Sequence, residues 1–348
     1  MEQLLGPWGI CNLGAINLTT VVDKNGNIDY DRLKQLVQVG VRFLDRVIDL
    51  NNYILPKTRE KQFKMRRVGL GTLGLADLML IKGIRYGSQE SLELIDEVYS
   101  FIRNEAYRES VNLAKELGAA PAFYKEKFLS MPFIKRLPSD IRRQIAEHGI
   151  RNLTLLTQAP TGTTSMLAGV SGGIEPNFGW EIIREDGTGK STIKHWLVEE
   201  TDEKGNIVET VDWVENKGQF VKGTDLSPKE HIDVQGKIQK YVDVSISKTI
   251  NAPQSHTVDE VEDAFMYAYD KGCKGLTYYR VGSRTGVVKQ KGEDNETNDS
   301  NEDESKVQEQ LDKIEKQQDG ICPECGSELN RKEGCEDCPN CFYSKCFL

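Results

Sequence analysis

Residues 67–77 read Arg-Val-Gly-Leu-Gly-Thr-Leu-Gly-Leu-Ala-Asp, and the interpretation of these three glycines decides the fold class. Their spacing matches the GxGxxG pattern of dinucleotide-binding folds, in which the glycines follow a buried strand. Here the basic residues Arg66 and Arg67 stand where that strand should end, and no second strand with an acidic residue follows about 20 positions later. We therefore predict that the glycines permit close backbone packing at the start of a helix and bind no dinucleotide.

Periodicity outside this stretch predicts helices interleaved with strands. Apolar residues recur at helical spacing over 30–50, and a second helical pattern runs over 91–117, where Gly118 is placed to end it. Short apolar runs at 154–156 and 242–246 are typical of strands. This alternation predicts an α/β fold over residues 1–287.

Composition bounds the class of protein. The chain has 348 residues and a formal net charge of −9, which argues against non-specific nucleic-acid binding, because phosphate neutralisation needs a basic surface. No run approaches the roughly 20 apolar residues that span a membrane. We read no export signal at the start and expect a cytoplasmic protein without a membrane or nucleic-acid partner.

The end of the chain changes character twice. Residues 288–320 are acidic and polar, which predicts a disordered linker, and residues 321–348 hold six of the eight cysteines. Cys322-Pro-Glu-Cys325 and Cys338-Pro-Asn-Cys341 form two CxxC knuckles that suit tetrahedral zinc.

Two tail cysteines remain, Cys335 and Cys346, and they suit thiol–disulfide exchange on a flexible tether. The ligand set stays open, because Cys335-Glu-Asp-Cys338 could equally be the second knuckle. The four histidines show no metal-ligand spacing, so we interpret each as an ordinary core or surface residue.

Residues 159–165, Ala-Pro-Thr-Gly-Thr-Thr-Ser, follow the apolar run at 154–156. Hydroxyl groups beside the N–H groups of a helix N-terminus can bind an anion, and the glycine permits close backbone approach. The pattern alone leaves two alternatives open, a phosphate site or an ordinary capped turn.

Taken together, several ordered segments resemble the ribonucleotide reductase large-subunit family, and the cysteine-rich tail resembles that of its adenosylcobalamin-dependent (class II) members. The segments are Glu2-Gln-Leu-Leu, Cys11-Asn-Leu-Gly-Ala-Ile-Asn-Leu18, Arg67-Val-Gly-Leu-Gly71, Gly74-Leu-Ala-Asp77, Ala159-Pro-Thr-Gly-Thr-Thr-Ser165, Gly173-Ile-Glu-Pro-Asn-Phe178, Ser247-Lys-Thr-Ile-Asn251, Gly272-Cys-Lys-Gly275 and Tyr279-Arg-Val-Gly-Ser-Arg284.

The resemblance implies the C-terminal portion of a ten-stranded α/β barrel with a central finger loop, and the reduction of ribonucleotides by thiyl-radical chemistry. Glu2 then resembles the general base on the ribose 3′-hydroxyl, and Cys11 one of the two reducing thiols. The substrate diphosphate would lie on the turn; the residues implied are Pro160, Thr161, Gly162, Thr163 and Thr164. The tail cysteines would relay electrons from a thioredoxin-like reductant.

The sequence also departs from the family. The family's finger loop carries Asn-x-Cys-x-Glu, and its radical cysteine would fall one residue before Met1. We therefore expect this chain to need an N-terminal half of the reductase, as part of a split enzyme, or to be a truncated fragment. A different class of function also stays open, a non-catalytic zinc-ribbon protein that binds a partner.

Overall fold

We describe the protein from a computed structural model, over residues 3, 5–186, 189–204, 206–211, 219–280, 288–290, 322, 325–332, 335–341 and 343–346. The chain divides into two compact units, residues 1–292 and 293–348, and each is described by itself. Our predicted first region ended at 287, whereas residues 288–290 pair with a strand of the first unit. The predicted disordered linker otherwise lies outside the described residues.

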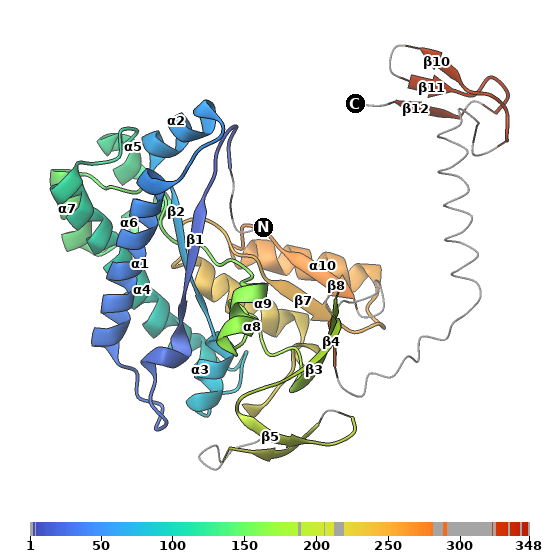
Figure 1. The fold of residues 1–348 in the computed structure, drawn as a ribbon, viewed down its shortest axis with the longest axis horizontal. Coiled ribbons are helices and arrows are strands. Elements are labelled where there is room, and N and C mark those ends of the chain that lie inside the picture. Colours follow the sequence, from blue (N-terminus) through green and yellow to red (C-terminus); the bar gives the residue numbers. More distant parts are fainter. Residues whose placement is uncertain are drawn as a thin grey trace. The chain divides into compact units, whose positions relative to one another are not determined.

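Parallel pairing organises the first unit (Figure 1). Strand β1 (Asn12–Asn17) lies beside β2 (Val68–Leu73) in parallel, with Ala15 opposite Gly71. Parallel bridges join Leu70 to Leu156 and Gln158 to Ile246. Across the sheet, the extended segment at 156–158 therefore lies beside β2, and the segment that contains Ile246 lies beside that one. Strands β7 (Thr249–Ala252) and β8 (Thr277–Arg280) form a second parallel pair. Parallel strands joined through helices confirm the α/β class; the segments predicted as strands at 154–156 and 242–246 make only these isolated bridges.

The helices of the first unit connect the strands and cover them. Their bounds are α1 Tyr30–Leu50, α2 Pro56–Met65, α3 Leu75–Ile81, α4 Gln89–Leu117, α5 Lys125–Ser130, α6 Pro132–Lys135, α7 Ser139–His148, α8 Gly162–Ala168, α9 Pro228–Gln239 and α10 Val258–Asp270, with short 3-10 turns η1 at Leu18–Val21 and η3 at Gly223–Asp225. The two helices predicted from periodicity are confirmed, and Gly118 ends α4 with a positive φ. None of the described helices combines the length and apolar character that crossing a membrane requires.

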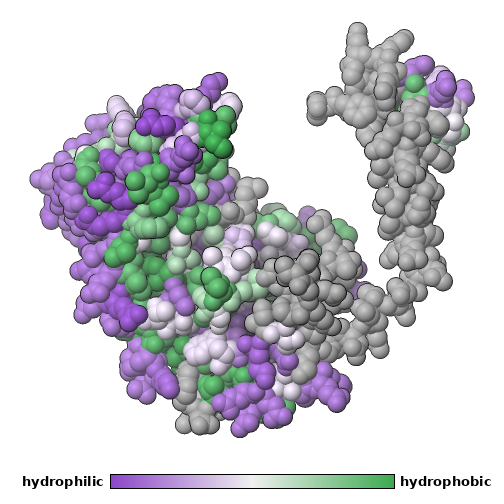
Figure 2. Space-filling view, in the orientation of Figure 1, coloured by the Kyte–Doolittle hydropathy of each residue, from purple (hydrophilic) through white to green (hydrophobic). Residues whose placement is uncertain are grey.

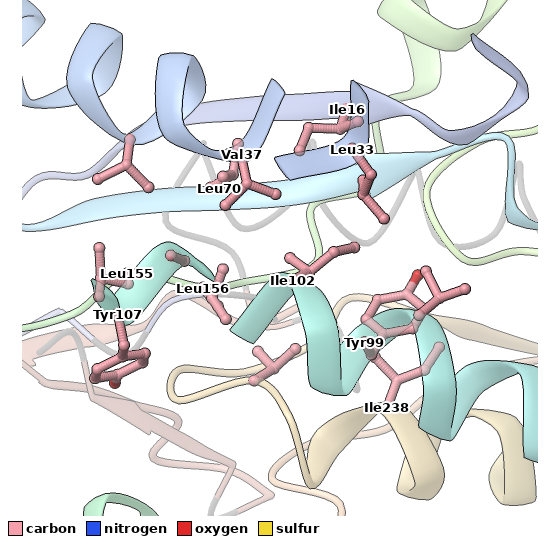
Figure 3. Packing of buried hydrophobic residues seen from close by; sticks show 14 of the residues in the cluster. Ile16, Leu33, Val37, Leu70, Tyr99, Ile102, Tyr107, Leu155, Leu156 and Ile238 are labelled. Carbon is pink, nitrogen blue, oxygen red and sulfur yellow. The ribbon is translucent and has the colours of Figure 1, made fainter. Parts of the chain in front are cut away.

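One hydrophobic core joins these elements. Figure 3 shows side chains from α1, β1, β2, the 155–156 segment, α4 and α9 meeting in one cluster. Val37 of α1, Leu70 of β2 and Ile238 of α9 are fully or almost fully buried from solvent. Because each element contributes an apolar face to the same cluster, the sheet and its covering helices form one cooperative unit.

Hairpins complete the two units. Strand β3 (Glu181–Asp186) pairs antiparallel with β4 (Gly189–Lys194) and with β9 (Val288–Gln290), and β5 (Val198–Thr201) pairs with β6 (Ile207–Thr210). In the tail, β10 (Asn330–Lys332), β11 (Cys335–Asp337) and β12 (Ser344–Cys346) form a small antiparallel sheet.

The glycines of residues 67–77 pack closely, as predicted, although two of them lie in a strand and only one at a helix start. A side chain at Gly71 would stand 2.5 Å from the carbonyl oxygen of Thr157, and one at Gly69 would meet Leu13 and Thr157. Gly74 precedes α3 with φ of 77°. The glycines therefore allow β2 to lie close to its neighbouring segments.

We predict that Gly71→Ala lowers the free energy of unfolding by about 1–3 kcal/mol, the usual result of overpacking a core. Gly14→Ala on the neighbouring strand is the matched control, because its added carbon would meet Leu44 at an ordinary 3.4 Å. Urea denaturation of both variants tests this prediction. Equal effects at the two positions would contradict it.

Candidate active-site turn and cysteine cluster

The predicted phosphate-binding turn lies where the extended segment ending at Gln158 leaves the sheet (Figure 1). Thr161 caps α8 with a left-handed backbone, φ 51°, which is unusual for a residue with a side chain. Gly162, Thr163 and Thr164 are exposed in the first helical turn. N–H groups in a first turn have no acceptor within the helix. These amides and hydroxyls can therefore contact an anion from solvent.

A hydrogen bond orients the Thr161 hydroxyl. Its Oγ1 accepts from the backbone N–H of Gly173 at 2.7 Å. Since that oxygen is engaged as an acceptor, its own hydrogen remains the group that can donate to a ligand. A threonine hydroxyl held in this way suits a phosphate oxygen, which accepts hydrogen bonds.

A buried carboxylate anchors the loop that faces the turn. Asp77 of α3 is fully buried and accepts from the backbone N–H of Ser171 at 2.6 Å. The Nε2 atom of His195 lies 2.6 Å from the other carboxylate oxygen, and Trp196 Nε1 donates to that oxygen at 3.3 Å. Asp77 thus joins α3, the loop at 171 and the segment between β4 and β5.

The electrostatics at Asp77 follow from these contacts. Burial alone would raise the pKa of this carboxyl, but the hydrogen bonds from His195 and Ser171 outweigh burial and hold the pKa below its ordinary value. No local pattern predicts this contact, because His195 lies 118 residues from Asp77. Both histidine nitrogens are engaged, since Nδ1 also accepts from Leu197 N–H, so the interpretation of His195 as a core residue agrees with its environment.

The predicted reducing thiol, Cys11, lies far along the sheet from the turn. Cys11 is half-buried and directly precedes β1, whereas the turn follows the opposite, carboxyl end of a nearby parallel segment. Six residues of extended strand span roughly 20 Å. The structure therefore does not bring Cys11 and Thr161 into contact. Glu2, the predicted general base, lies outside the described residues.

Four cysteines of the tail converge. Sγ atoms of Cys322, Cys325, Cys338 and Cys341 all lie within 4.8 Å of one another, an arrangement that could hold a metal ion. The knuckles are closed by backbone hydrogen bonds from Cys322 to Ser327 and from Cys338 to Tyr343, each 2.7 Å. Among the described cysteines, Cys338 converges with Cys341, which is the first of the two pairings that the sequence left open.

The two remaining tail cysteines lie on neighbouring strands. Cys335 begins β11 and Cys346 ends β12, and the two are directly opposite in the antiparallel register. Directly opposite residues in such a pair have Cα atoms about 4.5–5.5 Å apart, within the range that a disulfide spans.

We expect Asp77→Asn to lower the free energy of unfolding at pH 7 by about 2–3 kcal/mol, because the amide cannot accept from all the donors that face it. A carboxyl whose folded pKa is depressed stabilises at neutral pH, and that contribution is lost as the pH falls through the depressed value. The difference from the parent protein should therefore shrink below about pH 4.

Denaturation at a series of pH values measures this difference. Asp270→Asn, exposed at the end of α10, is the control and should change the stability by less than about 0.5 kcal/mol. A difference between Asp77→Asn and the parent protein that does not vary with pH would count against the assignment.

Known proteins resemble this chain over most of its length. Residues 2–279 match the family described as "Ribonucleotide reductase, barrel domain". A vitamin B12-dependent ribonucleoside-diphosphate reductase of Thermoplasma acidophilum is 34% identical over 302 residues, which cover 82% of this chain and 37% of that protein. One of Mycobacterium tuberculosis (strain H37Rv) is 33% identical, covering 82% and 40%.

A ribonucleoside-diphosphate reductase subunit alpha of Chlamydia pneumoniae is 28% identical, covering 80% of this chain and 30% of that protein. The chain thus spans about two fifths or less of the length of these relatives. Since the family match extends over most of the first unit, the chain belongs to the ribonucleotide reductase family, of which it carries barrel-domain sequence.

Proposed function

We propose that this chain forms part of an enzyme that reduces ribonucleotides to 2′-deoxyribonucleotides. The observation that carries the proposal is the turn at 159–165, a family-like segment whose exposed amides and hydroxyls suit a diphosphate. Its residues Pro160, Thr161, Gly162, Thr163 and Thr164 would bind the substrate phosphates. The first unit would then be the C-terminal portion of a ten-stranded barrel.

The chemistry at the ribose would fall to Glu2 and Cys11. The Glu2 carboxylate would take the proton of the 3′-hydroxyl. The Cys11 thiol and a second thiol from outside this sequence would form a disulfide, giving up two electrons as the 2′-hydroxyl leaves as water.

The relatives' names indicate a cobalamin cofactor. Adenosylcobalamin supplies a carbon-centred radical when bound. The imidazoles of His195 and His231 do not suit it as ligands, because both ring nitrogens of each are engaged. The cavity beside α2 measures about 550 Å³, too small to enclose a corrinoid. Adenosylcobalamin would therefore be held by groups other than these two imidazoles and this cavity.

A partner for the first unit would carry the family's Asn-x-Cys motif. Among the described strands, β1 pairs only with β2, and Leu13 on β1 is 43% exposed. Val39 and Phe43 on α1, one helical turn apart, are 64% and 65% exposed. Figure 2 shows hydrophobic surface on the face that carries α1 and β1. An open strand edge beside exposed apolar side chains suits pairing with the N-terminal half of a reductase barrel.

The tail would be a zinc ribbon that carries a redox pair. Four thiolates from two knuckles are the usual ligands of structural zinc. The bound metal would hold the small sheet in register, with Cys335 opposite Cys346. That pair would pass electrons from a thioredoxin-like reductant to the active-site disulfide. Such a relay needs reduced thiols, which the cytoplasm maintains.

We predict one zinc ion per chain, and that Cys338→Ser releases it because one of four thiolate ligands is lost. Cys346→Ser is the matched control, a tail cysteine outside the proposed ligand set, and should retain the metal. Elemental analysis of the purified full chain measures the content. Equal zinc content in the two variants would refute this ligand set.

A second prediction concerns catalysis. Mixing the chain with an N-terminal reductase half that carries the Asn-x-Cys motif should restore adenosylcobalamin-dependent reduction of a ribonucleoside diphosphate. Cys11→Ser should abolish multiple turnover, because the reducing disulfide cannot form. The assay is chromatographic detection of deoxynucleotide.

Cys273→Ser is the control for this assay, because burial raises the pKa of that thiol to about 11 and leaves it unreactive. Failure of any such pair to associate, or unchanged turnover with Cys11→Ser, would refute the proposed role of the chain.

A further inference from the structure

Three polar side chains meet beneath the loop that faces the turn, and the proposed chemistry uses none of them. Lys248, just before β7, has a fully buried side chain. Its Nζ lies 2.8 Å from Glu175 Oε2, 2.9 Å from His231 Nδ1 and 3.2 Å from the carbonyl oxygen of Thr249. A protonated lysine has three N–H donors, and here each has an acceptor.

The protonation states follow from these contacts. Burial, and then the nearby Lys248 charge, lower the pKa of His231 to about 3, so its ring is neutral. The His231 Nε2 atom lies 2.9 Å from the carbonyl of Gly223, which identifies Nε2 as the protonated nitrogen and Nδ1 as the acceptor. Burial lowers the pKa of Lys248, and the negative charge of Glu175 offsets only part of that effect. The cluster is therefore an ion pair between the fully buried Lys248 and the partly buried Glu175, beside a neutral imidazole.

This ion pair is connected to the turn by short hydrogen bonds. Glu175 Oε1 accepts from Thr249 N–H at 2.6 Å, and Glu175 N–H donates to Gly172 O at 2.8 Å. The next residue, Gly173, donates to Thr161 Oγ1. Gly173 has φ of 50°, and a side chain there would stand 2.8 Å from the carbonyl of residue 159. The loop at 172–175 thus lies between the ion pair and the turn, in contact with both.

The stability that the ion pair contributes and the position that it gives to the loop at 172–175 are two separate effects. A buried ion pair contributes little net stability compared with well-packed apolar side chains, because desolvation offsets the attraction. A left-handed threonine costs about 1–3 kcal/mol and persists only where its surroundings fix it. The loop at 172–175 is part of these surroundings: Glu175 holds it through Thr249, and its Gly173 N–H donates to Thr161 Oγ1.

We propose that Lys248 is a positioning residue for the phosphate turn: through Glu175 it fixes loop 172–175, and Gly173 then orients the Thr161 hydroxyl towards the substrate diphosphate. Lys248 itself touches no substrate. This inference rests on the proposed phosphate site, and it adds to that site the buried groups that determine its geometry.

The test uses the full chain and two readouts. Hydrogen exchange of the Gly173 and Glu175 amides reports the loop without any ligand, and calorimetric titration with ADP reports the site. Lys248→Met should speed exchange at both amides about tenfold and weaken ADP binding about tenfold, the effect of losing one hydrogen bond. Lys274→Met is the matched control, since Lys274 donates to the carbonyls of Asp243 and Val244 elsewhere in the sheet, and it should change neither readout.

A second variant separates positioning from general destabilisation. Thr161→Val removes both the acceptor of the Gly173 N–H and the hydroxyl that would donate to the phosphate, so it should speed exchange at Gly173 and weaken ADP binding. If Lys248 acts through Thr161, the double variant should lose no more ADP affinity than either single variant, because the two changes remove the same arrangement. Should Lys248→Met fail to fold, Glu175→Gln, which removes the charge that pairs with Lys248, decides by the same two readouts.

Each outcome is decisive. Exchange at Gly173 that is unchanged in a folded Lys248→Met variant, or additive losses in the double variant, would overturn the positioning role. Absence of ADP binding by the parent chain would instead overturn the proposed phosphate site, whereas faster exchange in Lys248→Met would still support positioning of the loop.

Discussion

The close approach of β2 to the segment at 155–158 is the constraint on which the rest of the first unit depends. It is possible only because Gly69 and Gly71 have no side chains: a carbon added at Gly71 would lie 2.5 Å from a backbone oxygen. With that contact made, Leu70 bridges Leu156. The chain then leaves the sheet after Gln158 at the place where the turn at 159–165 can present its amides and hydroxyls.

Polar groups buried beneath the turn extend the same arrangement. Asp77 holds the loop at Ser171 from α3, and the Lys248–Glu175 pair holds it from β7. Polar groups buried in a core are costly unless they are paired. The pairing of Asp77 and of Lys248 therefore supports a fixed loop, and a fixed loop is what a strained Thr161 needs.

Part of this could be predicted from the sequence, where the determining forces are local. Apolar periodicity predicted the helix at 30–50 with its observed bounds, and the CxxC spacing predicted the four cysteines that converge in the tail. The contact of Asp77 with His195 could not be predicted, because two residues 118 apart leave no local pattern. The second knuckle stayed ambiguous for the same reason, since Cys338 lies three residues from Cys335 and from Cys341 alike.

The central claim is that the turn at 159–165 binds the diphosphate of a ribonucleotide on a reductase barrel. The most direct measurement is a crystal structure of the full chain with a ribonucleoside diphosphate. Our account predicts phosphate density on the amides of Gly162, Thr163 and Thr164, beside the Thr161 hydroxyl, with the ribose directed towards the end of β1 that follows Cys11. A phosphate bound elsewhere, such as in the cavity beside α2, with the turn left empty, would contradict it.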